Sequence, residues 1–204
     1  LPVGQHHGID AGLPGADHVV KLMEKLAPSP FAESWDNVGL LAGSMVAPVE
    51  RIMVTLDVSA DTIEHAIGHN VDMIISHHPV IFSPMKAIND KNIVSKNLLS
   101  VIKAGISVFC AHTNLDKAKG GMDDALAKGL GLRDIKPLTP FDNALEPTIG
   151  RLGVLAEPTS LKEYLLIAKK ALNAKSVSYI GDDNRLIETV ASCAGAGGDL
   201  LRML

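Results

Sequence analysis

Two adjacent histidines, His77 and His78, follow the apolar run 71–76 and are closed off by Pro79. A short run rich in Val, Met and Ile is typical of a buried strand. Imidazole nitrogen is a good ligand for Zn, Fe, Ni and Cu. The pattern therefore predicts a strand that delivers two imidazoles to a sheet edge, where a metal ion or a substrate can reach them.

A second polar cluster follows a similar apolar run. The run 106–110 is succeeded by His112 and, four residues later, by Asp116. In an open α/β sheet the ligand crevice lies outside the carboxyl ends of the parallel strands. We therefore expect four metal ligands to converge there, namely His77, His78, His112 and Asp116.

The spacing within each pair leaves alternatives open. Neighbouring strand residues point to opposite faces, so His77 and His78 share one ion only if the strand has already ended, as Pro79 suggests, or if two ions are bound. His112 and Asp116 would share a face only in a helix, and we expect a loop there. The alternative to ligation is a hydrogen-bonded surface pair of histidines at a strand end.

Three other motifs are given a structural interpretation. His65 and His69 have helical spacing but lie on what we expect to be a solvated helix face. The stretch 195–199 resembles a phosphate-binding turn, but it lacks a full nucleotide-binding fingerprint and is assigned as a tight turn. Asp36 and Asn37 beside Trp35 could hydrogen-bond a ligand or form a turn, and their spacing alone favours the turn.

The elements that must position these residues alternate along the chain. A helix with Asp17 as its N-cap comes first, and Pro28 ends it. It is followed by a buried strand at 51–57, a helix at 60–69, a strand at 71–76, a helix at 91–104 and a strand at 106–110. This rhythm predicts a largely parallel or mixed sheet with helices on its faces.

Glycines and prolines divide the chain into lobes. We expect a flexible leader or tag remnant at 1–16, a first α/β lobe carrying the ligands at 17–136, a connection at 137–148 and a second α/β lobe at 149–204. The first lobe would close with a helix at 120–127. The second would hold strands at 149–155, 176–180 and 187–193, and a helix started by the capping-box pair Ser160 and Glu163.

Composition excludes several classes of protein. The chain has 204 residues, 47% of them hydrophobic, which is enough for a sizeable core. A net charge of −4 and a pI near 6.0 provide no basic surface for nucleic acid. No apolar run is long enough for a membrane span. The two cysteines, Cys110 and Cys193, lie in apolar runs and are expected to be free thiols, which fits a cytoplasmic protein.

Four ordered motifs carry a family resemblance, at residues 34–40, 76–79, 112–116 and 193–198. Together they resemble the YbgI/YqfO dinuclear metal-centre proteins, also called Nif-three-like or GTP cyclohydrolase I type 2 homologues. The resemblance implies a two-lobed Nif-three-like α/β fold, two divalent ions per subunit and a homohexameric ring. It also places His77, His78, His112 and Asp116 on the family's N-terminal ligand positions.

The family completes its centre with a further His and Glu near the C-terminus. The chain ends at Leu204, soon after the Gly-rich turn, so we expect those ligands and part of the second lobe to be missing. Only a short connection separates the lobes, which matches the compact type of member.

The resemblance implies metal-dependent hydrolysis with a nucleotide as substrate. With GTP, activated water would attack the imidazole carbon of the purine and open that ring. A non-enzymatic metal-binding, metal-delivery or regulatory ring is the alternative, and a nucleotide-binding adaptor using the Gly-rich turn is a third. The residues do not distinguish Fe, Zn, Mn and Ni, and they assign no catalytic acid or base.

Overall fold

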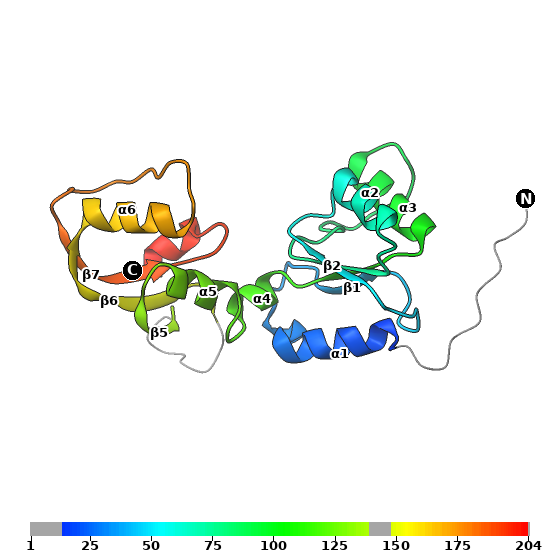
Figure 1. Ribbon diagram of the computed structural model, residues 1–204, viewed down its shortest axis with the longest axis horizontal. Coiled ribbons are helices and arrows are strands. Elements are labelled where there is room, and N and C mark those ends of the chain that lie inside the picture. Colours follow the sequence, from blue (N-terminus) through cyan, green and yellow to red (C-terminus); the bar gives the residue numbers. More distant parts are fainter. Residues whose placement is uncertain (1–13, 139–147, 204) are drawn as a thin grey trace, which may run out of the picture. The chain divides into compact units, whose positions relative to one another are not determined.

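The computed structural model describes residues 14–138 and 148–203. The chain forms two compact units, Leu1–Asn114 and Leu115–Leu204, and each has its own sheet (Figure 1). Most of the expected leader, residues 1–13, and most of the expected connection, residues 139–147, lie outside the described part. Gly15 is already bridged to Pro48, and the first helix begins at Ala16, the last residue of the expected leader.

The first unit is built on a four-stranded sheet in the order β1-β4-β3-β2. Its strands are β1 Gly39–Ala42, β2 Ile52–Thr55, β3 Met73–Ser76 and β4 Ser107–Cys110. Strands β2, β3 and β4 run parallel, with Thr55 opposite Ser76 and Ser76 opposite Cys110. Strand β1 is antiparallel to β4. The sheet is therefore mixed, and the carboxyl ends of its three parallel strands lie at one edge.

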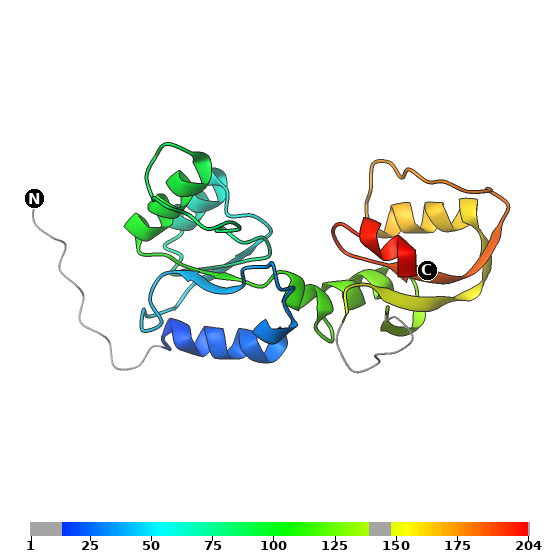
Figure 2. The same ribbon diagram turned by 180° about the vertical axis from the view of Figure 1, so that it is seen from behind.

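Helices cover both faces of this sheet (Figures 1 and 2). Helices α2 and α3 lie on one face and α1 lies on the other. The bounds are α1 Ala16–Leu26, the 3-10 helix η1 Ser29–Phe31, α2 Ala60–Gly68 and α3 Ile93–Ala104. Side chains start the two central helices, because Ser59 accepts a hydrogen bond from the amide of Thr62 and Asn92 accepts one from Ser95.

The core of the first unit lies between β3, β4 and the helices α2 and α3. Its buried members are apolar and come from all four elements and their flanking loops: Val58, Ile63, Ala66, Val71, Ile74, Val80, Leu98, Val101, Ile106 and Val108. Strand β2 was expected to be buried, and that prediction was wrong. It is the edge strand of the sheet, and Val54 is 77% exposed.

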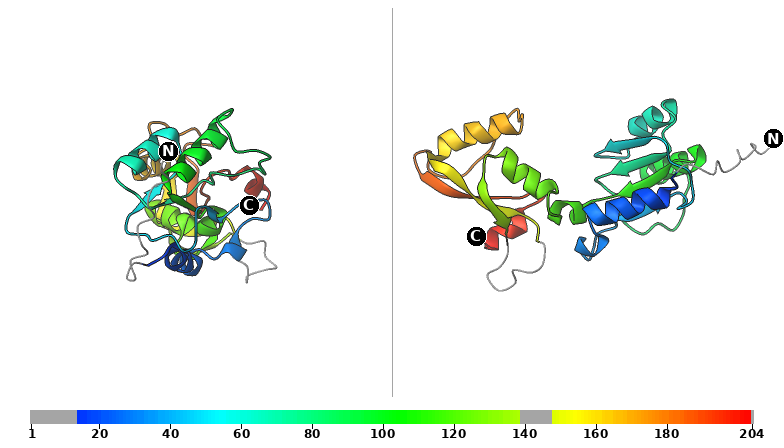
Figure 3. Two further views of the ribbon diagram at one scale, coloured as in Figure 1. Left: turned by 90° about the vertical axis from the view of Figure 1, so that its right-hand side faces the viewer. Right: turned by 60° about the horizontal axis from the view of Figure 1, so that its bottom comes forward.

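The second unit contains a three-stranded antiparallel sheet in the order β5-β6-β7. Helices α5 and α6 pack on it around a small core that includes Ala127, Leu130 and Leu132 (Figure 3). Its elements are α5 Met122–Gly129, β5 Arg133–Pro137, β6 Arg151–Ser160, α6 Leu161–Ala171, β7 Leu186–Ser192 and the 3-10 helix η2 Gly198–Met203. The capping box of Ser160 and Glu163 is present at α6, as predicted. The division at Asn114 assigns α5 and β5 to this unit, although sequence spacing had grouped them with the first lobe.

Three local predictions need correction. Asp17 lies within α1, whose N-cap is Gly15, because the helix starts two residues earlier than its apolar pattern suggests. Residues 176–180 form no strand, and Ile180 is fully exposed, so this apolar stretch has no partner strand among the described residues. Residues 113–117 were expected to be a loop but form helix α4, Thr113–Lys117. None of the helices in the described part of the chain has the length and apolar character needed to span a bilayer.

Candidate metal site

Three histidines form a cluster beyond the carboxyl ends of β3 and β4. His77, His78 and His112 each offer one ring nitrogen to a group whose atoms all lie within 4.8 Å of one another. The ring centroids are 5.2 Å apart for His77 and His78, and 5.1 Å apart for His77 and His112. The corresponding distance for His78 and His112 is 5.6 Å. This spacing allows three ligand atoms to meet at one ion.

Strand β3 ends at Ser76, just before the two adjacent histidines. The backbone stays attached to β2, since the amide of His77 donates to the carbonyl of Thr55 at 3.1 Å and that of His78 donates to Leu56 at 2.9 Å. Beyond the strand end the two side chains no longer have to alternate between faces. Adjacent histidines can therefore join one cluster, as the position of Pro79 had suggested.

Each histidine of the cluster has a hydrogen-bond acceptor at Nδ1. The acceptor is the carbonyl oxygen of Ala111 for His77, at 3.0 Å, and the carboxylate of Asp57 for His78, at 2.7 Å. For His112 it is the carboxylate of Asp36, at 2.9 Å. A carbonyl or an ionised carboxylate only accepts, so Nδ1 must carry the proton and the lone pair of a neutral ring lies on Nε2. Metal-binding histidines in proteins are held in this way.

Asp36 is the most deeply buried of these acceptors, with no exposed side-chain surface. Besides His112 it accepts hydrogen bonds from the amide of Thr113 at 3.1 Å, from the Thr113 hydroxyl at 2.5 Å and from the amide of Asn37 at 2.8 Å. Burial disfavours the ionised carboxylate, but the bonds from Thr113, His112 and Asn37 outweigh it and lower the pKa of Asp36. Asp36 is thus held as an anion that orients His112.

The residues around His112 each contribute to its position. The amide of His112 donates to the side-chain oxygen of Asn114 at 2.9 Å, and the Asn114 amide group donates to the carbonyl of Ala27 at 2.7 Å. The side chain of Asn37 donates to the carbonyl of Ile81 at 2.6 Å. This bond ties the loop containing Asp36 to the segment that follows the two histidines. The cluster is therefore supported from three separate parts of the chain.

The protonation states suit metal binding by imidazole and not by thiolate. Burial, opposed in part by the Ala111 hydrogen bond, lowers the pKa of His77, so this ring is neutral at neutral pH. Burial and the nearby Asp36 carboxylate raise the pKa of the Cys110 thiol to about 12. Its sulfur donates to the carbonyl of His77 at 3.1 Å. Cys110 supports the site as a neutral thiol next to the histidines.

The fourth predicted ligand, Asp116, lies in α4 and is 6% exposed. It belongs to the second compact unit, whereas the three histidines belong to the first, and its ligation of the same centre stays a prediction. The other motifs keep their structural roles. His65 on α2 and His69 at its C-cap are both exposed, and the amide of Ala194 beside the Gly-rich turn donates to the Asp123 carboxylate at 2.7 Å.

Sequence reasoning missed two residues of this site, Asp36 and Asp57. Asp57 follows β2 at the same sheet edge as His78, so the parallel strand order could have indicated it. Asp36 could have been found only as a polar residue in the turn beside Trp35, a pattern too common to distinguish a histidine partner from a turn former.

Fold and site together define a two-sheet α/β protein with a histidine cluster at the carboxyl edge of its parallel strands. The chain belongs to the family described as Duf34/NIF3 (NGG1p interacting factor 3), whose model matches residues 15–204. The resemblance inferred from the four motifs is therefore confirmed.

Relatives and solved structures agree with this assignment. A GTP cyclohydrolase 1 type 2 homolog from Clostridium acetobutylicum is 36% identical over 179 residues, covering 87% of this chain and 67% of the relative. NIF3-like protein 1 of Drosophila melanogaster is 31% identical over 188 residues, covering 90% of this chain and 64% of the relative. The chain thus spans about two thirds of the length of these relatives.

The expected two-lobed α/β fold is confirmed by solved structures. A Bacillus cereus protein related to NIF3 matches with a TM-score of 0.87 at 22% identity, covering 95% of this chain and 80% of that one. Reduced HcgD from Methanocaldococcus jannaschii matches with a TM-score of 0.71 at 31% identity, covering 90% and 70%.

Proposed function

We propose that this protein binds divalent metal ions through His77, His78 and His112 and is a metal-dependent hydrolase of the GTP cyclohydrolase I type 2 class. The observation that supports the proposal is the shared arrangement of the three rings. Each has an acceptor on Nδ1, which directs the lone pair of the neutral ring to Nε2, and their ligand atoms lie within 4.8 Å of one another.

The donor set fits a borderline divalent ion. Neutral imidazoles suit Zn, Fe, Ni and Cu, and a carboxylate ligand would extend the choice to Mn. We propose Asp116 as that carboxylate and two ions per subunit as the full complement. Bound ions would supply Lewis acidity and activate water for attack on the substrate.

The chain's own residues would hold and orient this centre. The buried Asp36 anion would keep the ring of His112 in one tautomer and increase its basicity as a ligand. Asp57 would do the same for His78 with a weaker effect, because the Asp57 side chain is 62% exposed. With GTP as substrate, the reaction would open the imidazole ring of the purine, as the names of the relatives suggest.

The first test is metal content per chain, measured by elemental analysis on the full-length, untagged protein. We expect about two ions per chain, as a dinuclear centre requires. His78→Ala should lose metal, whereas the matched control His65→Ala, an exposed histidine on α2, should retain it. Absence of metal in the unmodified protein, or equal loss in both variants, would overturn the proposal.

The second test separates an enzyme from a metal-binding ring without turnover. The metal-loaded protein is incubated with GTP, and formylated or ring-opened product is followed by mass spectrometry. Asp116→Ala should abolish turnover together with metal binding. Retained metal without any product would favour the non-enzymatic alternative. Mass photometry of the same sample would test the homohexamer that the family resemblance implies.

A further inference from the structure

Two exposed aromatic side chains extend from the histidine cluster across the surface of the first unit. The Trp35 ring is 6.2 Å from the His112 ring, in an edge-to-face arrangement, and 6.0 Å from the ring of Phe82. Trp35 is 57% exposed and Phe82 is 55% exposed. Large aromatic side chains usually bury most of their surface. The exposed pair forms an apolar platform beside the candidate metal site, and its two rings are tilted by 57° to each other.

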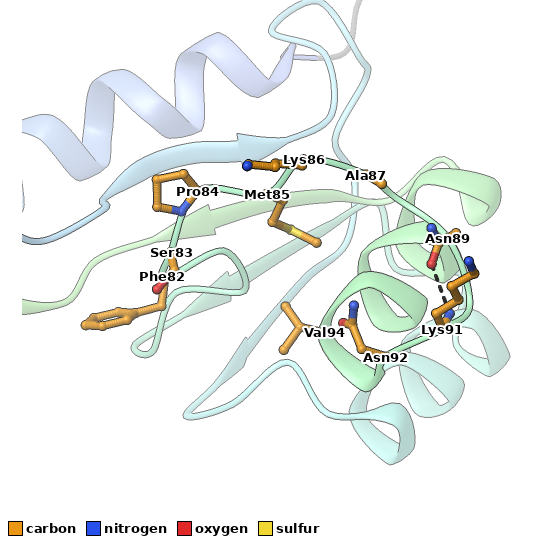
Figure 4. Close-up of a pocket in the computed structure, with 10 residues that line it drawn as sticks. All are labelled: Phe82, Ser83, Pro84, Met85, Lys86, Ala87, Asn89, Lys91, Asn92 and Val94. Carbon is orange, nitrogen blue, oxygen red and sulfur yellow. Dashed lines mark hydrogen bonds between the residues drawn. The ribbon is translucent and has the colours of Figure 1, made fainter.

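Phe82 also lines a pocket of the first unit (Figure 4). Its volume is about 480 Å³, which lies within the range of small-molecule sites. Phe82 lines one end, Lys91 and Asn89 lie at the other, and Met85 and Val94 lie between them. Phe82 therefore belongs to both the platform and the pocket lining, and its ring points away from Met85 and Val94.

The charged side chains that line the pocket are all positive. The residues that line it include Lys86 and Lys91 and no carboxylate. The chain as a whole carries a net charge of −4, so this local excess of positive charge runs against the overall composition. Two ammonium groups suit an anionic group, and lysine is a common point-charge partner for phosphate.

We propose that this surface is the nucleotide subsite of the metal centre. The purine packs against the tilted rings of Trp35 and Phe82 beside the histidines, and the phosphates extend into the pocket toward Lys86 and Lys91. The placement rests on the proposed function in taking GTP as the ligand. It adds that the base lies next to the ligand atoms of the histidine cluster, where purine ring opening would have to occur. A base on an aromatic pair also explains why both rings remain exposed.

Binding can be followed without any turnover, because Trp35 is the only tryptophan of the chain. The full-length, metal-free protein is titrated with GTP, guanosine or inorganic tripolyphosphate, and Trp35 fluorescence is recorded. Calorimetry measures the same affinities in variants. We expect saturable quenching by GTP and by guanosine, because the base covers the indole. Tripolyphosphate should also bind, but it should quench Trp35 fluorescence less, because it carries no base to cover the indole.

Variants divide the subsite into its two halves. Phe82→Ala should weaken GTP and guanosine binding about tenfold or more, the usual effect of losing a stacking partner. Lys86→Ala combined with Lys91→Ala should weaken GTP binding several-fold and leave guanosine binding unchanged. The controls are Tyr179→Ala, an exposed aromatic in the second unit, and Lys103→Ala on α3, outside the pocket. Neither control should alter binding.

The possible outcomes separate this subsite from the metal centre. If GTP and guanosine leave Trp35 fluorescence unchanged, or if Phe82→Ala binds GTP as tightly as the unmodified protein, the subsite is wrong even when two ions per chain are found. If tripolyphosphate alone binds as tightly as GTP, the stacking half is wrong. If quenching and the variant effects occur without metal uptake, the subsite stands and the proposed hydrolase does not.

Discussion

The carboxylate of Asp36 lies 2.9 Å from Nδ1 of His112, although 76 residues separate the two in the chain. The side chain of Asp36 is fully buried and that of His112 is 17% exposed. A buried anion that faces a partly exposed imidazole fixes the ring on one side and leaves the other side open to a ligand. The strength of the candidate metal site should therefore depend on Asp36.

Asp36→Asn should lower metal affinity about 10- to 100-fold, because the amide is a weaker acceptor and no longer enforces the tautomer of His112. The measurement is competition for metal against a chromophoric chelator. Asp57→Asn is the matched control, and its effect should be smaller because Asp57 is 62% exposed. Equal affinities for the Asp36 variant and the unmodified protein would contradict the role given to Asp36.

Asp124 should make the second unit sensitive to acid. Burial opposes its ionisation, but hydrogen bonds from the Gly120 amide and the Arg151 guanidinium, together with the charge of Arg151, lower the pKa of Asp124 below its ordinary 3.8. A lowered carboxyl pKa adds stability above 3.8, and that stability is lost as the pH falls through the pKa of the folded protein. Arg151 is only 3% exposed, so removing the negative charge of its partner Asp124 should lower the free energy of unfolding.

Asp124→Asn should therefore reduce the free energy of unfolding by about 2 kcal/mol at neutral pH. The difference from the unmodified protein should shrink in acid, because the protonated Asp124 carboxyl is then uncharged, like the Asn side chain of the variant. Urea unfolding at a series of pH values measures this. Asp90→Asn, at an exposed carboxylate, is the control and should show little difference at any pH. A difference for Asp124→Asn that does not change with pH would refute the charge-based explanation.

Gly43 should tolerate no side chain. Its φ is +109°, and a Cβ atom there would lie 2.4 Å from the hydroxyl oxygen and 2.8 Å from the Cα atom of Ser107 in β4. Gly43→Ala should destabilise the first unit by at least about 2 kcal/mol, through backbone strain and the clash with β4. Gly68→Ala is the matched control, because nothing lies within 4 Å of its added Cβ atom and it lies in α2. It should stabilise the helix by up to about 1 kcal/mol. Urea unfolding of both variants would show equal effects if the local geometry were wrong.

The two cysteines should resist alkylation in the folded protein. Burial and the charge of Asp36 raise the pKa of Cys110 to about 12, and burial with the charge of Asp123 raises that of Cys193 to about 11. The thiolate is the reactive form, so little of it is present at neutral pH. Mass spectrometry after iodoacetamide treatment should find Cys110 unmodified in the native protein and both cysteines modified after denaturation. Rapid labelling of native Cys110 would contradict the buried environment.

Much of the first unit could be predicted because its signals are local. The alternation of apolar runs and helical spacing indicated β3, α3 and β4, and Gly105 at φ +73° ends α3 at the predicted place. The common direction of parallel strands then brought the residues after each strand to one edge. His77, His78 and His112 were expected together for that reason, and they are.

Other predictions failed where the result depended on distant segments. Val54 is an apolar residue typical of a buried strand, but β2 is the edge strand of the sheet and leaves Val54 77% exposed. The second unit shows the same limit, since strand β5 lies in a segment without a clear apolar alternation and exists through its pairing with β6. Burial and strand pairing depend on what packs against a segment, and a local pattern carries no information about that.

The candidate ligands, the strands that carry the histidines and the family of the chain could all be read from local sequence patterns. The acceptor that holds each histidine is known from the three-dimensional fold alone, because Asp36 and Asp57 reach His112 and His78 through space and not through spacing along the chain. The same fold places Trp35 between His112 and Phe82. Hydrogen bonds and ring contacts require a few ångströms of approach, and this approach is set by the packing of elements that are remote in sequence.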